Sequence, residues 1–330
     1  MQPTPNSVYV DPLLSDMAVA FMQDATSFIS DQVFPTVPVQ YQTGKYDYYD
    51  RGAWYSIRAK PRAPGEESAG GGYTLQQKTY AIIPYAVHSD LDAQTAANAM
   101  PPEDPRRNKT RWCTTQLLLL KEKLWADGFF KAGVWTTDMT GVSGTSPTST
   151  QFTQWSNHTS STPIEDVEAQ ATAMEQLTGF TPNTLVIGRQ TWAGLKNHPQ
   201  LVDRIKYTQR GIMTEELLAA VFGLDKVLVS RATIDTAPES GASPPTGDVY
   251  SFLMGKGALL CYSAPAPSTE MPSAGYHFTW TGYLGASANG SVVYEIPAPL
   301  RKSVRIEGEL AVSPTIVAPD LGTFFATAVV

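Results

Sequence analysis

The chain has 330 residues, a formal net charge of -7 and a charged fraction of 17%. This length is enough for one large domain or two modest ones, and the 42% hydrophobic content excludes a disordered chain. The acidic balance argues against a reader of nucleic-acid sequence, which needs a basic face. Because soluble domains usually carry about 25% charged residues, the low fraction suits a protein that covers its surface with copies of itself.

Two cysteines, Cys113 and Cys261, are too few for a disulfide framework or a complete cysteine zinc site, so we expect small buried side chains. The first residues have no basic signal-like start, and no run reaches the ~20 apolar residues of a membrane span. We therefore interpret the sequons at Asn108, Asn157 and Asn289 as chance matches. We expect the protein to be made and kept in a cytoplasm.

The N-terminal stretch, residues 11–34, predicts an amphipathic helix. Apolar residues recur there at spacings of three and four: Leu14, Met17, Phe21, Ala25 and Phe28. Pro35 and Pro38 end the pattern and favour an extended exit. Such a stripe packs either on its own domain or on a neighbour, and the length of this arm favours a neighbour.

Residues 39–83 predict a long β-hairpin. Aromatic residues alternate with polar ones in a strand-like pattern: Tyr41, Tyr46, Tyr48, Tyr49, Trp54, Tyr55 and Tyr73. Between the strands lies a polar tip that contains residues 60–67 and the glycines 70–72. Since an isolated two-stranded hairpin is marginally stable in water, we expect a neighbouring subunit to support this one.

Residues 106–131 give the strongest helix pattern in the chain. Its apolar stripe is Cys113, Leu117, Leu120 and Leu124, widened by Trp112, Leu119 and Phe130. We expect Lys121, Glu122 and Lys123 to keep the opposite face in solvent. The pattern is longer than the ~10–14 residues of an average helix, which is typical of a helix that acts as a spine.

The remaining sequence predicts a loop, an α/β region and a β-rich end. The loop covers residues 136–162, which are rich in Ser, Thr and Gly. Helices are expected at 163–177, 190–197, 199–207 and 214–222, and short strands at 184–187 and 226–229. A proline-rich loop at 237–247 leads to β segments at 249–262, 275–284, 291–296 and 302–317.

The sequence offers no catalytic, cofactor or metal motif. The histidines His88, His158, His198 and His277 are scattered, so a zinc site is not expected. No nucleophile elbow or phosphate-binding loop occurs. The adjacent carboxylates 66–67 and 215–216 have diverging side chains and are interpreted as a solvated edge and a helix first turn. A site assembled from distant residues stays open.

Several segments, read in order, resemble the major capsid proteins of tailed bacteriophages. Residues 14–21 and 33–39 look like the N-terminal arm of that family, and 46–54, 60–65 and 67–73 look like its extended loop. Residues 116–123 look like its spine helix. Residues 182–188, 198–199 and 217–230 look like its axial domain. The similarity runs over nearly the whole chain, in the order of the family.

The resemblance implies an α+β protein with the Hong Kong 97-like capsid fold. It divides the chain into an N-terminal arm (1–40), an extended β-hairpin loop (41–83), a peripheral domain with the spine helix (84–162), an axial α/β domain (163–298) and a C-terminal return to the peripheral domain (299–330). The family assembles hexamers and pentamers into an icosahedral shell around double-stranded DNA. The arm begins so close to Met1 that no removed leader is expected.

The hairpin and arm supply the candidate contacts between subunits: Phe21, Phe28, Tyr46, Tyr48, Arg51, Trp54, Arg58, Arg62, Glu66 and Glu67. The three arginines could pair with acidic patches of the next copy, including Glu66 or Glu67 there. Some family members crosslink their shells through a lysine. Lys45, Lys60 and Lys78 match no such site, so no crosslink is expected.

The expected location is the virion, with assembly in the host cytoplasm. Scaffolding, portal and decoration proteins are further candidate partners. No cofactor, membrane or sequence-specific DNA contact is expected.

Two alternatives remain open. An encapsulin, a bacterial compartment with the same fold that encloses enzymes, would hold a protein cargo instead of DNA. The long arm and the Pro/Gly-rich hairpin tip favour the virus. A hydrolase with a dispersed site would show converging titratable groups with shifted pKa values in a pocket.

Overall fold

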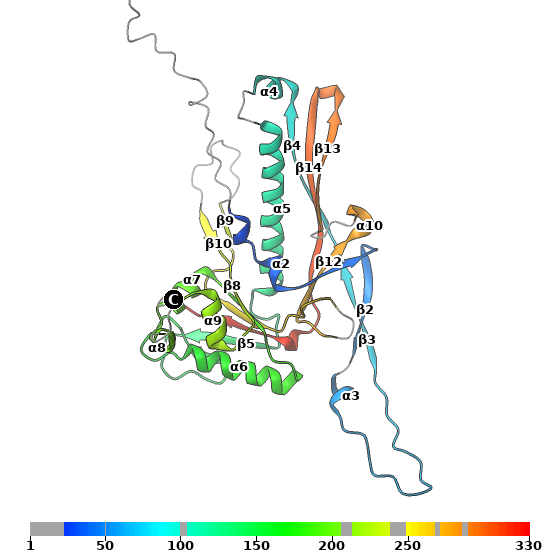
Figure 1. Ribbon diagram of the computed structural model, residues 1–330, viewed down its shortest axis with the longest axis vertical. Helices are drawn as coiled ribbons and strands as arrows, with labels where there is room; N and C mark the ends of the chain where they lie inside the picture. The colour runs from blue at the N-terminus through cyan, green and yellow to red at the C-terminus, as the bar shows by residue number, and fades with distance from the viewer. Residues whose placement is uncertain are drawn as a thin grey trace, which may run out of the picture.

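The computed structural model describes residues 23–49, 51–99, 104–205, 213–237, 249–267, 271–285 and 290–330. A 25-residue helix, α5 (Pro105–Phe129), runs along the long axis of the molecule (Figure 1). The Asp104 carboxylate caps it by accepting the backbone N–H groups of Arg106 and Arg107, and Pro105 fills the first turn. The long helix predicted from the sequence is confirmed.

A six-stranded mixed sheet forms the base of the body. Its order is β6 (Gln151–Thr153), β5 (Thr137–Val142), β15 (Gly322–Ala326), β11 (Ala258–Cys261), β7 (Thr184–Ile187) and β8 (Lys226–Val229). Strand β11 pairs antiparallel with both of its neighbours, and the other pairings are parallel. Every residue of β7 and β11 is buried, as expected of central strands.

Alternate residues of these strands supply two cores, because successive side chains of a strand point to opposite faces. One face, with Leu185, Ile187 and Phe325, packs on Trp155 and on residues of four helices. These helices are α6 (Pro163–Thr178), α7 (Arg189–Lys196), α8 (Pro199–Ile205) and α9 (Glu215–Phe222). Their expected positions are confirmed, and Gly179 ends α6 with a φ of 73°.

The other face of the six-stranded sheet meets the C-terminal end of α5. Val186, Leu259 and Cys261 belong to a second core with Trp125 and Phe129 of the helix. The rings of Phe34 and Phe129 lie 4.8 Å apart in this core. Cys113 and Cys261 are free and buried, as expected.

A five-stranded sheet covers the upper part of α5. It contains β1 (Thr36–Val39), β12 (Gly275–Trp280), β14 (Ser303–Ile316) and β13 (Ser291–Ala298) in that order, and β4 (Pro84–Asp92) also pairs with β14. Gly308 of β14 faces the helix, where a Cβ atom would lie 2.9 Å from Leu117 Cδ1. A glycine there lets the strand approach α5 closely.

Strand pairing does not follow the predicted domain boundaries. Strands β12 and β13 fall in the predicted axial range, yet they pair with β14 or β1 beside α5. Strand β15, expected in the C-terminal return, joins the six-stranded sheet. The predicted loop at 136–162 was wrong in part, because it contains β5 and β6. Parallel pairing of β5 with β15 orders that polar stretch, and this partner is remote in sequence.

Two predicted β segments are interrupted. Within 249–262, strand β10 (Tyr250–Phe252) pairs with β9 (Thr233–Asp235), whereas β11 belongs to the six-stranded sheet. The segment 275–284 ends in a short helix, α10 (Thr281–Leu284). Nearly all of the predicted loop at 237–247 lies outside the described residues.

The continuous helix predicted for 11–34 is wrong in its described part, and residues 11–22 lie outside the described residues. From Gln23 the chain forms a 3-10 turn, η2 (Ala25–Ser27), and a short helix, α2 (Ser30–Val33). The backbone N–H groups of Ile29 and Ser30 donate to the Glu122 carboxylate of α5. A partner on another element therefore replaces the hydrogen bonds that a continuous helix would make.

Candidate assembly surfaces

Strands β2 (Thr43–Tyr49) and β3 (Leu75–Ala81) form the predicted hairpin, with Tyr46 opposite Lys78. A short helix, α3 (Arg51–Tyr55), follows β2, so the expected strand conformation of Trp54 and Tyr55 was wrong. We call β2, β3 and α3 the hairpin base, and residues 56–74 the hairpin tip. The tip projects away from the body, at the end of the molecule opposite the β13–β14 turn (Figure 1).

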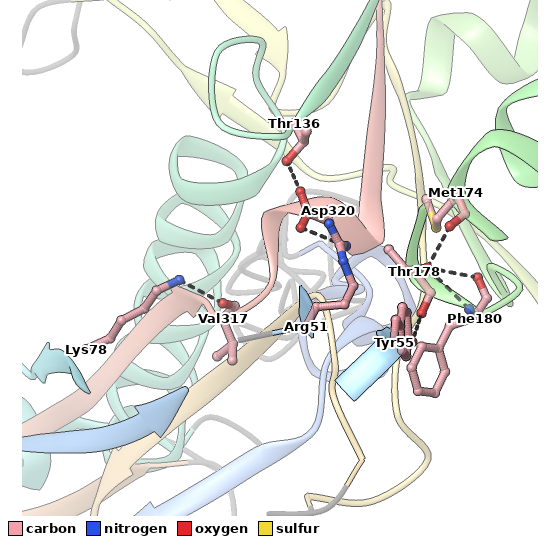
Figure 2. A network of polar contacts seen from close by, with 9 residues as sticks. All are labelled: Arg51, Tyr55, Lys78, Thr136, Met174, Thr178, Phe180, Val317 and Asp320. Atoms are coloured by element: carbon pink, nitrogen blue, oxygen red, sulfur yellow. Dashed lines mark hydrogen bonds and ion pairs between the residues drawn. The ribbon is translucent and has the colours of Figure 1, made fainter. Parts of the chain in front are cut away.

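The hairpin base is anchored to its own subunit. The rings of Tyr46 and Tyr80 stack on Phe278 of β12, with centroids 5.8 Å and 4.7 Å away. Figure 2 shows the polar contacts nearby: the Lys78 ammonium donates to the Val317 carbonyl at 3.1 Å, and the Tyr55 hydroxyl donates to the Thr178 carbonyl. The base therefore has a defined direction relative to the body.

Arg51 takes part in the same anchor. Its guanidinium lies 3.0 Å from the Asp320 carboxylate, whose other oxygen accepts the Thr136 hydroxyl (Figure 2). Arg51 was expected to reach an acidic patch of the next copy, and its partner in the structure belongs to its own chain. Tyr46 is likewise used within the subunit, and the ring of Tyr48 lies 4.5 Å from the Lys78 ammonium. These three residues position the hairpin.

Phe28 also differs from its expected role. Its side chain is 8% exposed and therefore covered by its own subunit. Phe21 lies outside the described residues.

The tip and its flanks expose large apolar side chains. Ile57 is 94% exposed, and Trp54 and Tyr73 remain 61% and 56% exposed although their rings stack at 5.5 Å. Exposed apolar groups that gather on one projection are typical of an interaction surface. The structure therefore brings these side chains together on an element that its own body does not cover.

The charged candidates of the tip are all exposed: Arg58, Arg62, Glu66 and Glu67. Arg62 Nε donates to the backbone carbonyl of Glu66 at 2.5 Å, and Arg58 Nε donates to the Ser56 hydroxyl at 3.1 Å. Each arginine keeps further N–H groups for other acceptors, because a guanidinium has five.

A second surface lies on the face of β4, β14 and β13 that points away from α5. Glu307 and Glu309 of β14 alternate with Ile306, Gly308 and Leu310, which are buried toward the helix. Tyr294 lies opposite Glu307, and the Tyr283 hydroxyl donates to Glu309 at 3.1 Å. This hydrogen bond raises the pKa of Tyr283, while desolvation and Glu309 raise that of Tyr294. We call this surface the acidic face.

One cluster bears on the hydrolase alternative. The rings of His158 and His198 lie 5.3 Å apart, and His198 Nε2 lies 2.9 Å from the Ser161 hydroxyl oxygen. Gln200 N–H donates to His198 Nδ1, and the Ser161 hydroxyl donates to the Asn157 carbonyl. Nε2 must then carry the proton and donate to Ser161. A catalytic base would accept the serine proton instead, so this geometry is that of a structural hydrogen bond.

Within the described ranges, no group of three or more His, Cys, Asp or Glu residues is arranged to hold a metal ion. None of the helices in that part of the chain has both the length and the apolar character that a bilayer crossing requires.

The sequence matches known capsid proteins. Residues 119–277 match the family model described as phage major capsid protein E. The major capsid protein of Pseudomonas phage JBD67 is 25% identical over 331 residues, which covers 97% of each chain. The major capsid protein of Burkholderia phage BcepMu is 25% identical over 229 residues, 68% of this chain and 69% of that protein.

Solved structures show the same fold. A phage-related protein from Bordetella bronchiseptica RB50 has a TM-score of 0.67 at 22% identity and covers 96% of this chain and 97% of its own. The capsid structure of cyanophage P-SCSP1u has a TM-score of 0.61 at 10% identity, covering 99% and 95%. An encapsulin complex from Synechococcus elongatus PCC 7942 reaches 0.53 at 10% identity, covering 96% and 95%. Sequence and fold together identify this chain as a relative of the phage major capsid proteins, with the Hong Kong 97-like capsid fold.

Proposed function

We propose that this chain is the major capsid protein of a tailed phage, which assembles into hexamers and pentamers and closes into an icosahedral head around double-stranded DNA. The observation that carries the proposal is the hairpin: its base is fixed to the body, while its tip holds Trp54, Ile57 and Tyr73 largely in solvent. Burying such side chains on a neighbour would contribute about 25 cal/mol per Å² of apolar surface.

The acidic face is the neighbour surface that we propose for the tip. The tip and the acidic face lie toward opposite ends of the molecule (Figure 1), so they can meet only between copies. A contact between two different surfaces is heterologous, and it closes into a ring when the rotation fits. Arg58 and Arg62 would pair there with Glu307 and Glu309, an arrangement that sets register more than affinity.

The parts of the fold receive the following roles in this proposal. The hairpin is the extended loop, α5 with the five-stranded sheet is the peripheral domain, and the six-stranded sheet with α6–α9 is the axial domain. The shell needs no catalytic site, and its net charge of -7 suits a container that encloses DNA without gripping its sequence. Assembly would take place in the host cytoplasm, with scaffolding, portal and decoration proteins as further partners.

An encapsulin is the second candidate, because an encapsulin shares the fold. The similarity to a phage major capsid protein over 97% of the chain favours the phage.

Electron microscopy of the full-length chain, expressed alone and with its natural neighbours, tests the proposal. We expect closed icosahedral shells, and particles from the natural source should contain double-stranded DNA. Particles that hold a protein cargo would support the encapsulin. A chain that stays monomeric in every one of these settings would contradict both.

A further inference from the structure

Lys121 and Glu122 occupy buried positions in the middle of α5, where the sequence predicted a solvent-exposed face. Their side chains are 3% and 0% exposed. The Glu122 carboxylate accepts the backbone N–H of Ser30 at 2.9 Å and that of Ile29 at 3.1 Å. The Lys121 ammonium forms an ion pair with Asp31. Since burial of charge is costly unless it is paired, these four contacts fix one position of the segment on the helix.

The segment is also held from its other side. The Ser30 carbonyl lies 3.1 Å from His277 Nε2 of β12, so both backbone polar groups of this residue meet side chains of the body. Further along the chain the anchors change. The Gln32 carbonyl accepts from Lys226 at 2.6 Å, and Thr36 begins the ladder of β1 with β12. Residues 28–31 therefore rest on α5, whereas the chain after them is tied to the sheets.

We propose that Lys121 and Glu122 form a latch that holds residues 28–31 in one docked position and lets them detach while α5 stays folded. Burial of Phe28 and Ile29, which are 8% and 3% exposed, favours the docked position. On detachment the two charged groups of the helix regain water, which offsets part of the lost contacts. An apolar seat would instead be left exposed at full cost.

The rest of the helix does not depend on the latch. Cys113 and Leu117 contact Gly308 of β14 on a different side of α5, where the five-stranded sheet covers the helix. Released and docked forms would therefore share one body and differ in the direction in which the chain before residue 28 leaves it. This inference does not rest on the proposed function, although a shell subunit could use two such directions at different positions.

Hydrogen exchange of the full-length chain tests the latch, with Glu122→Ala, Glu122→Gln and a control, Asp127→Asn. Asp127 lies on the same helix and pairs with Lys123 in solvent. In Glu122→Ala we expect the amides of Ile29 and Ser30 to exchange roughly tenfold faster or more, because they lose their acceptor. Amides of β7 and of the N-terminal half of α5 should keep their protection. Glu122→Gln, which keeps one acceptor oxygen, should give a smaller increase, and Asp127→Asn none.

Unchanged exchange at Ile29 and Ser30 in Glu122→Ala would overturn the latch. Joint loss of protection in the segment and throughout α5, in both Glu122 variants, would overturn it as well, because the segment would then unfold only with the helix. Both readouts are made on the subunit, so they stay separate from the question of shell formation.

Discussion

The six-stranded sheet and the hairpin tip use the same kinds of side chain in opposite ways. Around the sheet, Trp155 and Phe325 are 0% exposed and pack ring against ring at 5.3 Å. On the tip, Ile57 is 94% exposed. The first region completes its core within one chain, as a folded domain must. The second presents apolar surface that only another molecule can cover. Stability and assembly should therefore respond to different residues.

Leu260→Ala should have the largest effect on stability, because this side chain is 0% exposed in the centre of β11. We expect a loss of about 2–5 kcal/mol in the free energy of unfolding, measured by urea denaturation. Ile57→Ala on the tip is the matched control, with a change below about 0.5 kcal/mol and reduced assembly. Equal destabilisation by the two substitutions would remove the distinction between the regions.

Charge reversal should affect assembly and leave the subunit intact. Arg58→Glu with Arg62→Glu places like charges against Glu307 and Glu309 of a neighbour, a repulsion that costs several kcal/mol. We expect little shell formation by light scattering, with an unchanged Tm of the subunit. Combining these changes with Glu307→Arg and Glu309→Arg should restore part of the yield. Failure of the combined variant to recover would reject the acidic face as the partner of the tip.

His277 should make the body sensitive to acid. Burial, followed by the nearby Lys121 charge, lowers the pKa of His277 to about 4. An unfolded histidine titrates near ~6.5, so its contribution to stability is complete above that pH and is lost as the pH falls toward 4. Burial raises the pKa of Glu122, which acts in the opposite direction. Urea denaturation of His277→Gln at pH 7 and pH 4.5 isolates the histidine. The variant should show a smaller loss on acidification.

The smallest effect is expected for Arg51→Ala in the hairpin base. Arg51 and Asp320 are partly exposed, so their ion pair should contribute no more than about 1 kcal/mol to stability. Its function is to hold α3, and hydrogen exchange should show faster opening of the hairpin base. Protection equal to that of the unmodified chain would mean that Tyr55 and Lys78 suffice as anchors.

Local patterns predicted the elements whose partners are close in sequence or whose periodicity is strong. The strands at 184–187 and 226–229 were predicted to the residue, and the long helix to within two residues at its C-terminal end. Strand β5 was missed because its polar composition resembles a loop, and it is ordered by β15, far along the chain. Strand β12 was assigned to the wrong unit for the same reason, since its pairing with β14 and β1 is a tertiary event.

The candidate contacts show the same limit. Aromatic alternation correctly indicated a hairpin, yet it could not separate Tyr46, which packs on Phe278, from Trp54, which stays exposed. Lys121 and Glu122 looked like solvent residues because their partners lie in a segment some 90 positions earlier. A charge pattern on a helix reports what the helix carries and not what covers it.

Replacing residues 56–73 by a short Gly-Ser linker tests the central claim most directly, because it removes the tip and keeps the anchored base. Electron microscopy and sedimentation of the purified protein are the measurement. We predict a folded, soluble subunit with the Tm of the full chain and no closed shells. Normal icosahedral shells from this variant would show that the tip is not the element that joins one copy to the next.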